Sequence, residues 1–295
     1  MAHTVFLIGE NIMTGRELYF KLRGMQNIPD SFENWAEYRN KVTEYLIAHS
    51  DNDRSIAILG AGKCNDVDLA KLKEHFFSIT LIDRDEDAMK EAVERYGLAD
   101  DEDVEIVVKD VVGITDEMYA DYADAMITEL NKKGRDTDIE EAAAVMLKKL
   151  DEIYDQIKDY DPELGIQQYD YVAAIGLHSQ LVNMLIWIWA IGLSNIGKSE
   201  KSVELNVKQQ DAMIVHKLND KLLLMARRGV FLGCEMSRAG VSGGVEGALQ
   251  AMGDMYGRNE HKQVHLDGVA TVTWPFDLSQ NIQYQMCLMN IKTNG

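Results

Sequence analysis

A short apolar run, SIAIL at residues 55–59, leads directly into Gly60-Ala61-Gly62 and then into a stretch with helical spacing. Glycine has no Cβ, so a Gly-x-Gly turn between a strand and a helix can bend tightly and let a ligand approach the backbone. The N–H groups at the start of the next helix favour an anionic group. Alone, such a turn is weak evidence of a ligand, because similar loops also occur for steric reasons.

The strand–helix pattern repeats after this turn, which indicates the α/β class. Further strands are predicted at SITLI (78–82), VEIVV (104–108), YDYVAAI (169–175) and GVFLGCEM (229–236). Continuous apolar strands separated by helices are typical of a parallel sheet covered on both faces. Near the carboxyl end, two strand-like runs at 269–276 and 282–292 are joined by a turn too short for a parallel crossover, so they predict an antiparallel hairpin.

No Ser/Gly-rich linker divides the chain. We predict an N-terminal helical or lid region over 1–50, a core over 51–112 and 166–295, and an acidic helical insertion over 113–165. Within these regions the spacing of apolar residues predicts helices over 31–49, from Leu181 onward, and over 203–228. The Gly-rich segment 239–257 is consistent with either a mobile lid or a plain surface connection.

The net charge of −19 is concentrated in one segment, since residues 100–163 carry 21 acidic and 7 basic side chains. A nucleic-acid partner would need basic groups to replace phosphate counterions. We therefore expect no nucleic-acid partner, and we interpret the acidic segment as a solvated helical face.

Three widely separated cysteines argue against a disulfide framework and for a reducing, cytoplasmic location. The longest apolar run, residues 181–193, is shorter than the ~18–20 residues that span a bilayer. The amino terminus has no basic region before its apolar run, so it does not resemble a signal peptide. We expect no membrane association and no metal, and leave a homodimer open.

The residues that follow each strand are the candidate site, because ligands of open α/β sheets bind at the carboxyl ends of strands. A dinucleotide fingerprint would need a third glycine at Asn65, and Asp66 would repel a pyrophosphate. Both side chains are better suited to an amino-acid moiety with its ammonium group. Asp83, about 20 residues past the turn, can accept hydrogen bonds from ribose hydroxyls. Further along, Asp110 can accept from an adenine amino group, with Val111 packing on the ring.

At these residues the chain resembles the class I S-adenosylmethionine-dependent methyltransferases. The similarity lies in AILGAGKCNDVDL, LIDRD, VVKDV and YDYVAAIGLHSQL, and in the terminal hairpin. It implies a Rossmann-like, doubly wound, mostly parallel seven-stranded sheet with an antiparallel C-terminal hairpin plus helical insertions. Leu59 stands where the family often has an acidic residue, and Cys64 where it has a third glycine.

The resemblance also implies roles for individual residues around S-adenosylmethionine. The methionine part would be surrounded by Gly60, Ala61, Gly62, Asn65 and Asp66. The ribose would lie at Asp83 and Arg84, the adenine at Asp110 and Val111, and the sulfonium above Gly176 and Leu177. Ser179 and Gln180, after the fourth strand, are the candidate substrate-binding residues.

His178 is the candidate general base, because it follows the fourth strand and an unperturbed imidazole titrates near pH ~6.5. A structural histidine, hydrogen-bonded at a helix start, is an equally good interpretation. We expect methyl transfer from S-adenosylmethionine to a small-molecule acceptor. The alternatives are an NAD(P)-dependent oxidoreductase and a non-catalytic protein that keeps the S-adenosylmethionine-binding fold.

Overall fold

The computed structural model describes residues 13–132, 136–241 and 245–293. The chain forms two compact units. The helical unit contains residues 1–27, 112–160 and 181–213, and the sheet unit contains residues 28–111, 161–180 and 214–295. These boundaries differ from the predicted ones. The helices Gly15–Met25 and Asn183–Ile196 group with the insertion through their contacts with the helix Asp116–Asn131, whereas residues 28–50 group with the sheet.

The helical unit is built from α1 (Gly15–Met25), α6 (Asp116–Asn131), α7 (Ile139–Ile157), α8 (Asn183–Ile196) and the first half of α9 (Ser202–Met225). Side-chain caps start three of these helices, at Thr14, Thr115 and Asp138. Tyr19 of α1 stacks on Tyr119 of α6 with ring centroids 5.0 Å apart. The two helices expected in the insertion are thus confirmed, and they pack within their own unit.

One helical stretch among the described residues, His178–Ile196, has the length and apolar composition of a membrane span, and half of it is buried. Within the helical unit, α8 packs on α6. Gly192 makes close approach possible, because a Cβ there would overlap the Met126 side chain. Length and composition alone are weak evidence of a span, since core helices of water-soluble proteins meet the same criterion.

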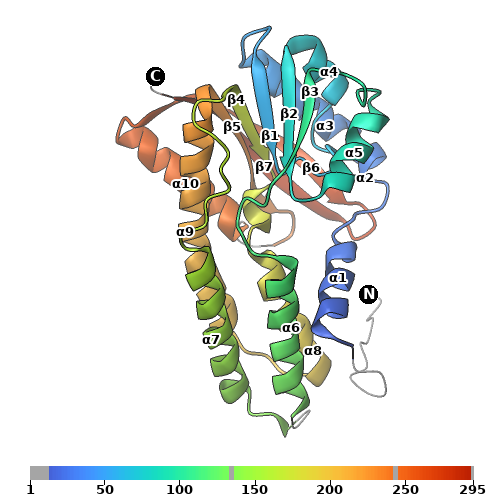
Figure 1. Ribbon diagram of the computed structural model, residues 1–295, viewed down its shortest axis with the longest axis vertical. Helices are drawn as coiled ribbons and strands as arrows, with labels where there is room; N and C mark the ends of the chain where they lie inside the picture. Colours follow the sequence, from blue (N-terminus) through green and yellow to red (C-terminus); the bar gives the residue numbers. More distant parts are fainter. Residues whose placement is uncertain (1–12, 133–135, 242–244, 294–295) are drawn as a thin grey trace. The chain divides into compact units, whose positions relative to one another are not determined.

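The sheet unit holds one seven-stranded sheet with the order β3-β2-β1-β4-β5-β7-β6 (Figure 1). Its strands are β1 (Ser55–Leu59), β2 (Ser78–Asp83), β3 (Val104–Val108), β4 (Tyr169–Ile175), β5 (Ala226–Arg238), β6 (Val264–Asp277) and β7 (Ile282–Thr293). The strands from β3 to β5 are parallel, and β7 is antiparallel to both neighbours. The predicted mostly parallel sheet with a terminal antiparallel hairpin is confirmed.

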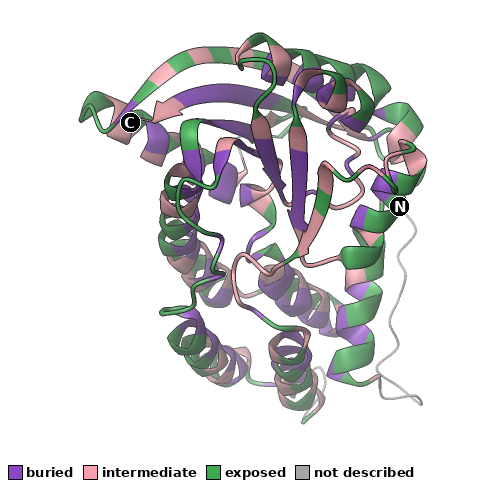
Figure 2. Ribbon diagram, turned by 45° about the horizontal axis from the view of Figure 1, so that its top comes forward, coloured by how far each residue is buried: buried purple, intermediate pink, exposed green. Residues whose placement is uncertain are grey.

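The helices of the sheet unit are α2 (Ser31–Asn34), α3 (Ala36–Ala48), α4 (Leu69–His75), α5 (Glu86–Arg95), the second half of α9 and α10 (Glu246–Glu260). A short 3₁₀ turn spans His178–Gln180. Apolar residues of α3, α4 and α5 share one buried cluster with β1, β2 and β4. The central strands are buried along most of their length, as predicted for a covered parallel sheet (Figure 2).

Three predictions of local structure need correction, two for helices and one for the Gly-rich segment. The helix expected over 203–228 ends at Met225, and Arg227 and Arg228 belong to β5, whose pairing with β4 starts at Ala226. The helix expected over 31–49 is broken at Trp35, whose indole donates to the Phe276 carbonyl at 3.1 Å. Residues 246–257 form most of α10 rather than a lid or loop, and residues 242–244 lie outside the described residues.

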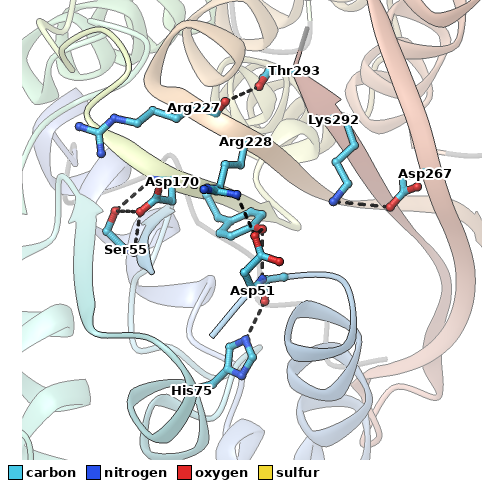
Figure 3. Close-up of polar contacts among 11 residues, drawn as sticks. Asp51, Ser55, His75, Asp170, Arg227, Arg228, Asp267, Lys292 and Thr293 are labelled. Carbon is cyan, nitrogen blue, oxygen red and sulfur yellow. Dashed lines mark hydrogen bonds and ion pairs between the residues drawn. The ribbon is translucent and has the colours of Figure 1, made fainter. Parts of the chain in front are cut away.

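The polar side chains at the amino-terminal edge of the sheet are paired with one another (Figure 3). Asp170 accepts from the backbone and hydroxyl of Ser55, both at 3.2 Å, and from Arg228 Nε at 3.3 Å. Asp51 accepts from Arg228 Nη1 at 2.9 Å and from the Tyr171 hydroxyl at 3.1 Å. These contacts tie β1, β4 and β5 together where the strands begin, and they explain why Arg228 is part of a strand.

Candidate functional site

The strand order reverses between the neighbouring strands β1 and β4, which makes this position the switch point of the sheet. The strands β2 and β3 lie on one side of β1, while β5 and the hairpin lie beyond β4. In open α/β sheets the ligand site lies outside the carboxyl ends of the strands at such a switch point. The turns after β1 and β4 touch there, because a Cβ on Gly60 would lie 2.8 Å from Leu177 Cδ1. All predicted site residues belong to the sheet unit.

The turn after β1 has the backbone that its glycines permit. Gly60 and Gly62 have φ angles of 69° and 45°, in the left-handed region that favours glycine. The amides of Gly60 and Ala61 donate to the Ile82 carbonyl at 2.9 and 3.3 Å, which holds the turn against β2. A Cβ on Gly62 would meet nothing closer than Asp83 Oδ2 at 4.0 Å. The backbone at Gly62 is therefore open to a ligand.

Asp83 ends β2 and faces this turn. Its Oδ2 accepts from the Gly62 amide and its Oδ1 from the Asp85 amide, each at 2.9 Å. Burial raises the pKa of Asp83, against the lowering effect of these backbone hydrogen bonds. Each carboxylate oxygen has a second lone pair, so the group can accept two further hydrogen bonds. Those are the bonds that two vicinal hydroxyls would donate.

The residues after β2 and β3 are joined by an ion pair, in which Arg84 Nη1 lies 3.5 Å from Asp110 Oδ2. Val111, the next residue, is half-buried. The pair connects the carboxyl ends of two neighbouring strands. Arg84 and Asp110 thus lie together at the predicted edge, and their ribose and adenine roles stay predictions.

Asn65 is held by the protein itself. Its Nδ2 donates to Ser31 Oγ at 2.9 Å, and its Oδ1 accepts from Arg95 Nη1 at 3.0 Å. The guanidinium of Arg95 lies over the Phe32 ring, 4.4 Å from its centroid. In this arrangement Asn65 fixes the turn against α2 and α5. Direct contact of its side chain with a ligand, which the resemblance implies, stays a prediction.

Asp66 lies at a small cavity below the turn, lined also by Gly60, Ala61, Cys64 and Ile175, among others. The cavity volume of about 10 Å³ is close to that of a single water site. Asp66 Oδ1 is buried and has no hydrogen-bond partner among the described residues. Burial and the nearby Glu235 carboxylate raise the pKa of Asp66 to about 7, while the Tyr38 hydroxyl and Arg39 act in the opposite direction. A buried carboxyl in this state would be stabilised by a cation.

Glu235 is a site residue that the sequence reasoning missed. It lies near the carboxyl end of β5, is 2% exposed, and its Oε1 accepts from Ser179 Oγ at 2.7 Å. Its Oε2 is buried without a hydrogen-bond partner in the described part of the chain. Burial raises the pKa of Glu235, although the Ser179 hydrogen bond lowers it. The signal in the sequence was a single carboxylate inside the apolar run GVFLGCEM.

The structure places His178 away from solvent, with 1% of the residue exposed. Its Nε2 lies 3.0 Å from Asn219 Oδ1, and Asn219 in turn donates to Asp254 Oδ2 at 2.8 Å. Burial lowers the pKa of His178 to about 4, against the raising effect of Asn219. The ring is therefore neutral at pH 7, which favours the structural interpretation, and the general-base role stays a prediction. Ser179 is engaged with Glu235, and the exposed Gln180 donates to Ser179 Oγ at 3.0 Å.

The strand order, the switch-point turns and the carboxyl at the end of β2 define a Rossmann-like protein with a candidate small-molecule site. No family model and no curated protein sequence matches the chain.

Among solved structures, the chain is similar to the N-methyltransferase NodS from Bradyrhizobium japonicum WM9 (9% identity, 90% of this chain and 99% of that chain covered, TM-score 0.45). It is also similar to magnesium protoporphyrin IX methyltransferase from Synechocystis PCC 6803 with bound S-adenosylmethionine (8%, 96% and 100%, TM-score 0.46). A candidate RNA methyltransferase from Pyrococcus horikoshii is a third (8%, 95% and 98%, TM-score 0.42). All three TM-scores lie below 0.5, so the fold assignment rests on the strand order and register given above.

Proposed function

We propose that the protein transfers a methyl group from S-adenosylmethionine to a small-molecule acceptor. The observation that carries this proposal is the buried Asp66 carboxyl, with an unpartnered oxygen, at the cavity below the glycine turn. A dinucleotide places a doubly negative pyrophosphate at such a turn, and Asp66 would repel it. S-adenosylmethionine instead brings an ammonium and a sulfonium, and both are attracted by a carboxylate.

The other residues at the switch point fit the same ligand. The open backbone at Gly62 gives room for the methionine part, and Asp83 keeps two acceptor positions for the ribose hydroxyls. Asp110 and Val111 follow the neighbouring strand, where an adenine would lie. When bound, the cofactor supplies a methyl group already activated on sulfur. The protein's contribution is then mainly to position the acceptor, which can account for roughly 7–11 kcal/mol of the barrier.

Two features support a small-molecule acceptor over a nucleic acid. The chain carries 49 acidic and 30 basic residues, so its surface field would oppose a polyanion. At the switch point itself, the side chains of Asp66, Asp83 and Glu235 are carboxyls, which offer no positive charge to a phosphate.

We further propose a cytoplasmic location, without a membrane or nucleic-acid partner. Cys64, Cys234 and Cys287 are free and buried, which supports a reducing environment. A homodimer stays an open proposal, which sedimentation analysis would test.

Titration calorimetry tests the cofactor assignment. We expect S-adenosylhomocysteine to release heat on binding and NADH to give no signal. Heat with NADH and none with S-adenosylhomocysteine would overturn the proposal in favour of an oxidoreductase. If neither ligand binds, the proposed methyltransferase activity is wrong.

A further inference from the structure

Behind the turn that follows β4, acidic and aromatic side chains gather around one point. A Cβ on Gly176 would lie 3.7 Å from Trp274 Cη2 and 3.9 Å from Glu235 Oε1. An indole ring and a carboxylate oxygen thus both lie within 4 Å of this position. Gly176 has a φ of 66°, so its conformation as well as the space in front of it favours glycine. We call Gly176, Ser179, Glu235, Trp274 and Tyr38 the acidic–aromatic cluster.

The aromatic part of the cluster comes from two distant segments. Tyr38 of α3 stacks on Trp274 of β6 with ring centroids 5.5 Å apart and an interplanar angle of 19°. Trp35 meets Trp274 edge-on at 4.9 Å, and Tyr284 lies 5.8 Å from it. The Trp274 ring is therefore held from several sides in a fixed orientation. Its Nε1 is buried and has no hydrogen-bond partner among the described residues.

Among the described residues, no cationic side chain forms an ion pair with Glu235. The forces on the Glu235 carboxyl are burial and the hydrogen bonds from Ser179 and its own backbone. Its second oxygen, Oε2, has no partner in the described chain, and the residue is 2% exposed. An unsatisfied buried carboxylate costs stability, since it has lost its water without gaining a partner. Gly176 and Ser179 are only half-buried, so a small ligand could approach Glu235 from their side.

We infer that the acidic–aromatic cluster binds an organic cation, and that the methyl acceptor is therefore an amine that enters the site in its protonated form. The ammonium would first give its proton to the Glu235 carboxylate, and the freed nitrogen lone pair would then form the new N–CH₃ bond as the bond from the methyl group to sulfur breaks. A cation beside Gly176 would lie next to an electron-rich indole ring and a desolvated carboxylate at the same time. A neutral alcohol or a carboxylic acid would gain neither, and an acid would be repelled by Glu235. The role of the bound amine as methyl acceptor rests on the proposed function, but cation binding itself can be measured without turnover.

The probe is tetramethylammonium, with tert-butanol as a neutral molecule of similar size. Binding is followed through the indole N–H resonance of Trp274, assigned with Trp274→Phe. We expect tetramethylammonium to shift this resonance in a saturable way and tert-butanol to leave it unchanged. Glu235→Gln should weaken tetramethylammonium binding roughly tenfold or more, because the charge is lost while the shape is kept. Glu105→Gln removes one negative charge from the exposed face of β3 and should leave binding unchanged.

Equal shifts with tert-butanol and tetramethylammonium, or no shift with either, would overturn the inference. If Glu235→Gln does not fold, Ser179→Ala and Trp274→Phe take its place. Binding to Trp274→Phe, followed by calorimetry, should be several-fold weaker, because phenyl attracts cations less than indole does. S-adenosylhomocysteine binding to the wild type is measured in parallel. If S-adenosylhomocysteine binds and tetramethylammonium does not, only the proposed class of acceptor is wrong. If S-adenosylhomocysteine fails to bind, the methyl-transfer proposal is wrong.

Discussion

The sheet has carboxylate side chains at both ends of its parallel strands, at an amino-terminal edge and a carboxyl edge, and their environments are opposite. At the amino-terminal edge, Asp170 and Asp51 each receive hydrogen bonds from Arg228 and from further donors. Burial tends to raise the pKa of Asp170, but the hydrogen bonds from Ser55 and Arg228 outweigh it and lower the pKa overall. Carboxylates that are ionised and paired in this way stabilise the fold.

At the carboxyl edge the balance is reversed. Burial raises the pKa values of Asp66, Asp83 and Glu235, and within the described part of the chain no ion pair offsets it fully. Two of these three carboxyls keep a buried oxygen without a partner among the described residues. Groups desolvated before any ligand arrives are expected where function requires them, because a cation or a hydroxyl can then bind without first displacing bulk water. The paired carboxylates at the amino-terminal ends of the strands therefore stabilise the fold, and the unpaired ones at the carboxyl ends support the proposed ligand site.

The largest effect is expected for Asp83→Ala at the carboxyl edge. It removes both proposed ribose acceptors and the partner of the Gly62 amide. With about 1.5–3 kcal/mol for each hydrogen bond to a charged group, affinity for S-adenosylhomocysteine should fall about a thousandfold. Calorimetry measures the loss, with Asp87→Ala on the exposed face of α5 as the control. Unchanged affinity in Asp83→Ala would show that the ligand lies elsewhere.

Asp66→Asn should stabilise the ligand-free protein at pH 8. The carboxyl has an ordinary pKa of 3.8 and a folded-state pKa of about 7, so the folded state takes up a proton. Its contribution to stability is complete below pH ~4 and is lost as the pH rises to about 7, because ionisation then favours the unfolded chain. We expect a gain of about 2–3 kcal/mol at pH 8 and little change at pH 4, from urea unfolding. A loss of stability at pH 8 would contradict the assignment of Asp66 as a desolvated carboxyl.

Much of the sheet unit could be predicted from local patterns. Apolar strand runs and the short hairpin link predicted the strands, the mostly parallel sheet and the antiparallel terminal pair, whereas the seven-stranded doubly wound arrangement was implied by the family resemblance. Asp83 was predicted at the carboxyl edge in the same way, because that prediction requires only the position where the second strand ends. The end of α9 was predicted three residues too late. Two arginines before a glycine are typical of a helix terminus, but Arg227 and Arg228 also fit a strand with acidic partners.

The acidic–aromatic cluster could not be predicted, because it exists only in three dimensions. Tyr38, Glu235 and Trp274 are brought together by α3, β5 and β6, and no spacing in the chain connects them. In the sequence, Tyr38 and Trp274 look like ordinary core aromatics, which their burial confirms. Their second property, an unpaired polar atom beside a buried carboxyl, depends on the packing.

His178 tests whether position at the carboxyl edge is enough to make a residue functional. It lies after β4, yet its Nε2 is hydrogen-bonded to Asn219, just as the carboxylates of the amino-terminal edge are hydrogen-bonded within the protein. His178→Ala should cost about 2 kcal/mol, because it leaves the buried Asn219 oxygen without a donor and opens a cavity. His178→Gln keeps a donor and should recover part of this loss. S-adenosylhomocysteine binding should be intact in both variants. Because the pKa of the ring is about 4, turnover governed by His178 would change between pH 3 and 5, and a rate change there would support the general-base role.

The smallest effect is expected at the amino edge itself, for Asp170→Asn. The carboxyl is part-buried, with hydrogen bonds from Ser55 and Arg228. Since its folded-state pKa is lowered, its contribution to stability is present above the unfolded pKa and is lost as the pH falls through the folded value. We expect a loss of about 1 kcal/mol at pH 7 that disappears as the pH falls through the folded-state pKa, together with unchanged S-adenosylhomocysteine affinity. The opposite signs of Asp170→Asn and Asp66→Asn at neutral to alkaline pH are what the comparison requires. If both variants shifted stability in the same direction, the two edges would not differ in the way the hydrogen bonds indicate.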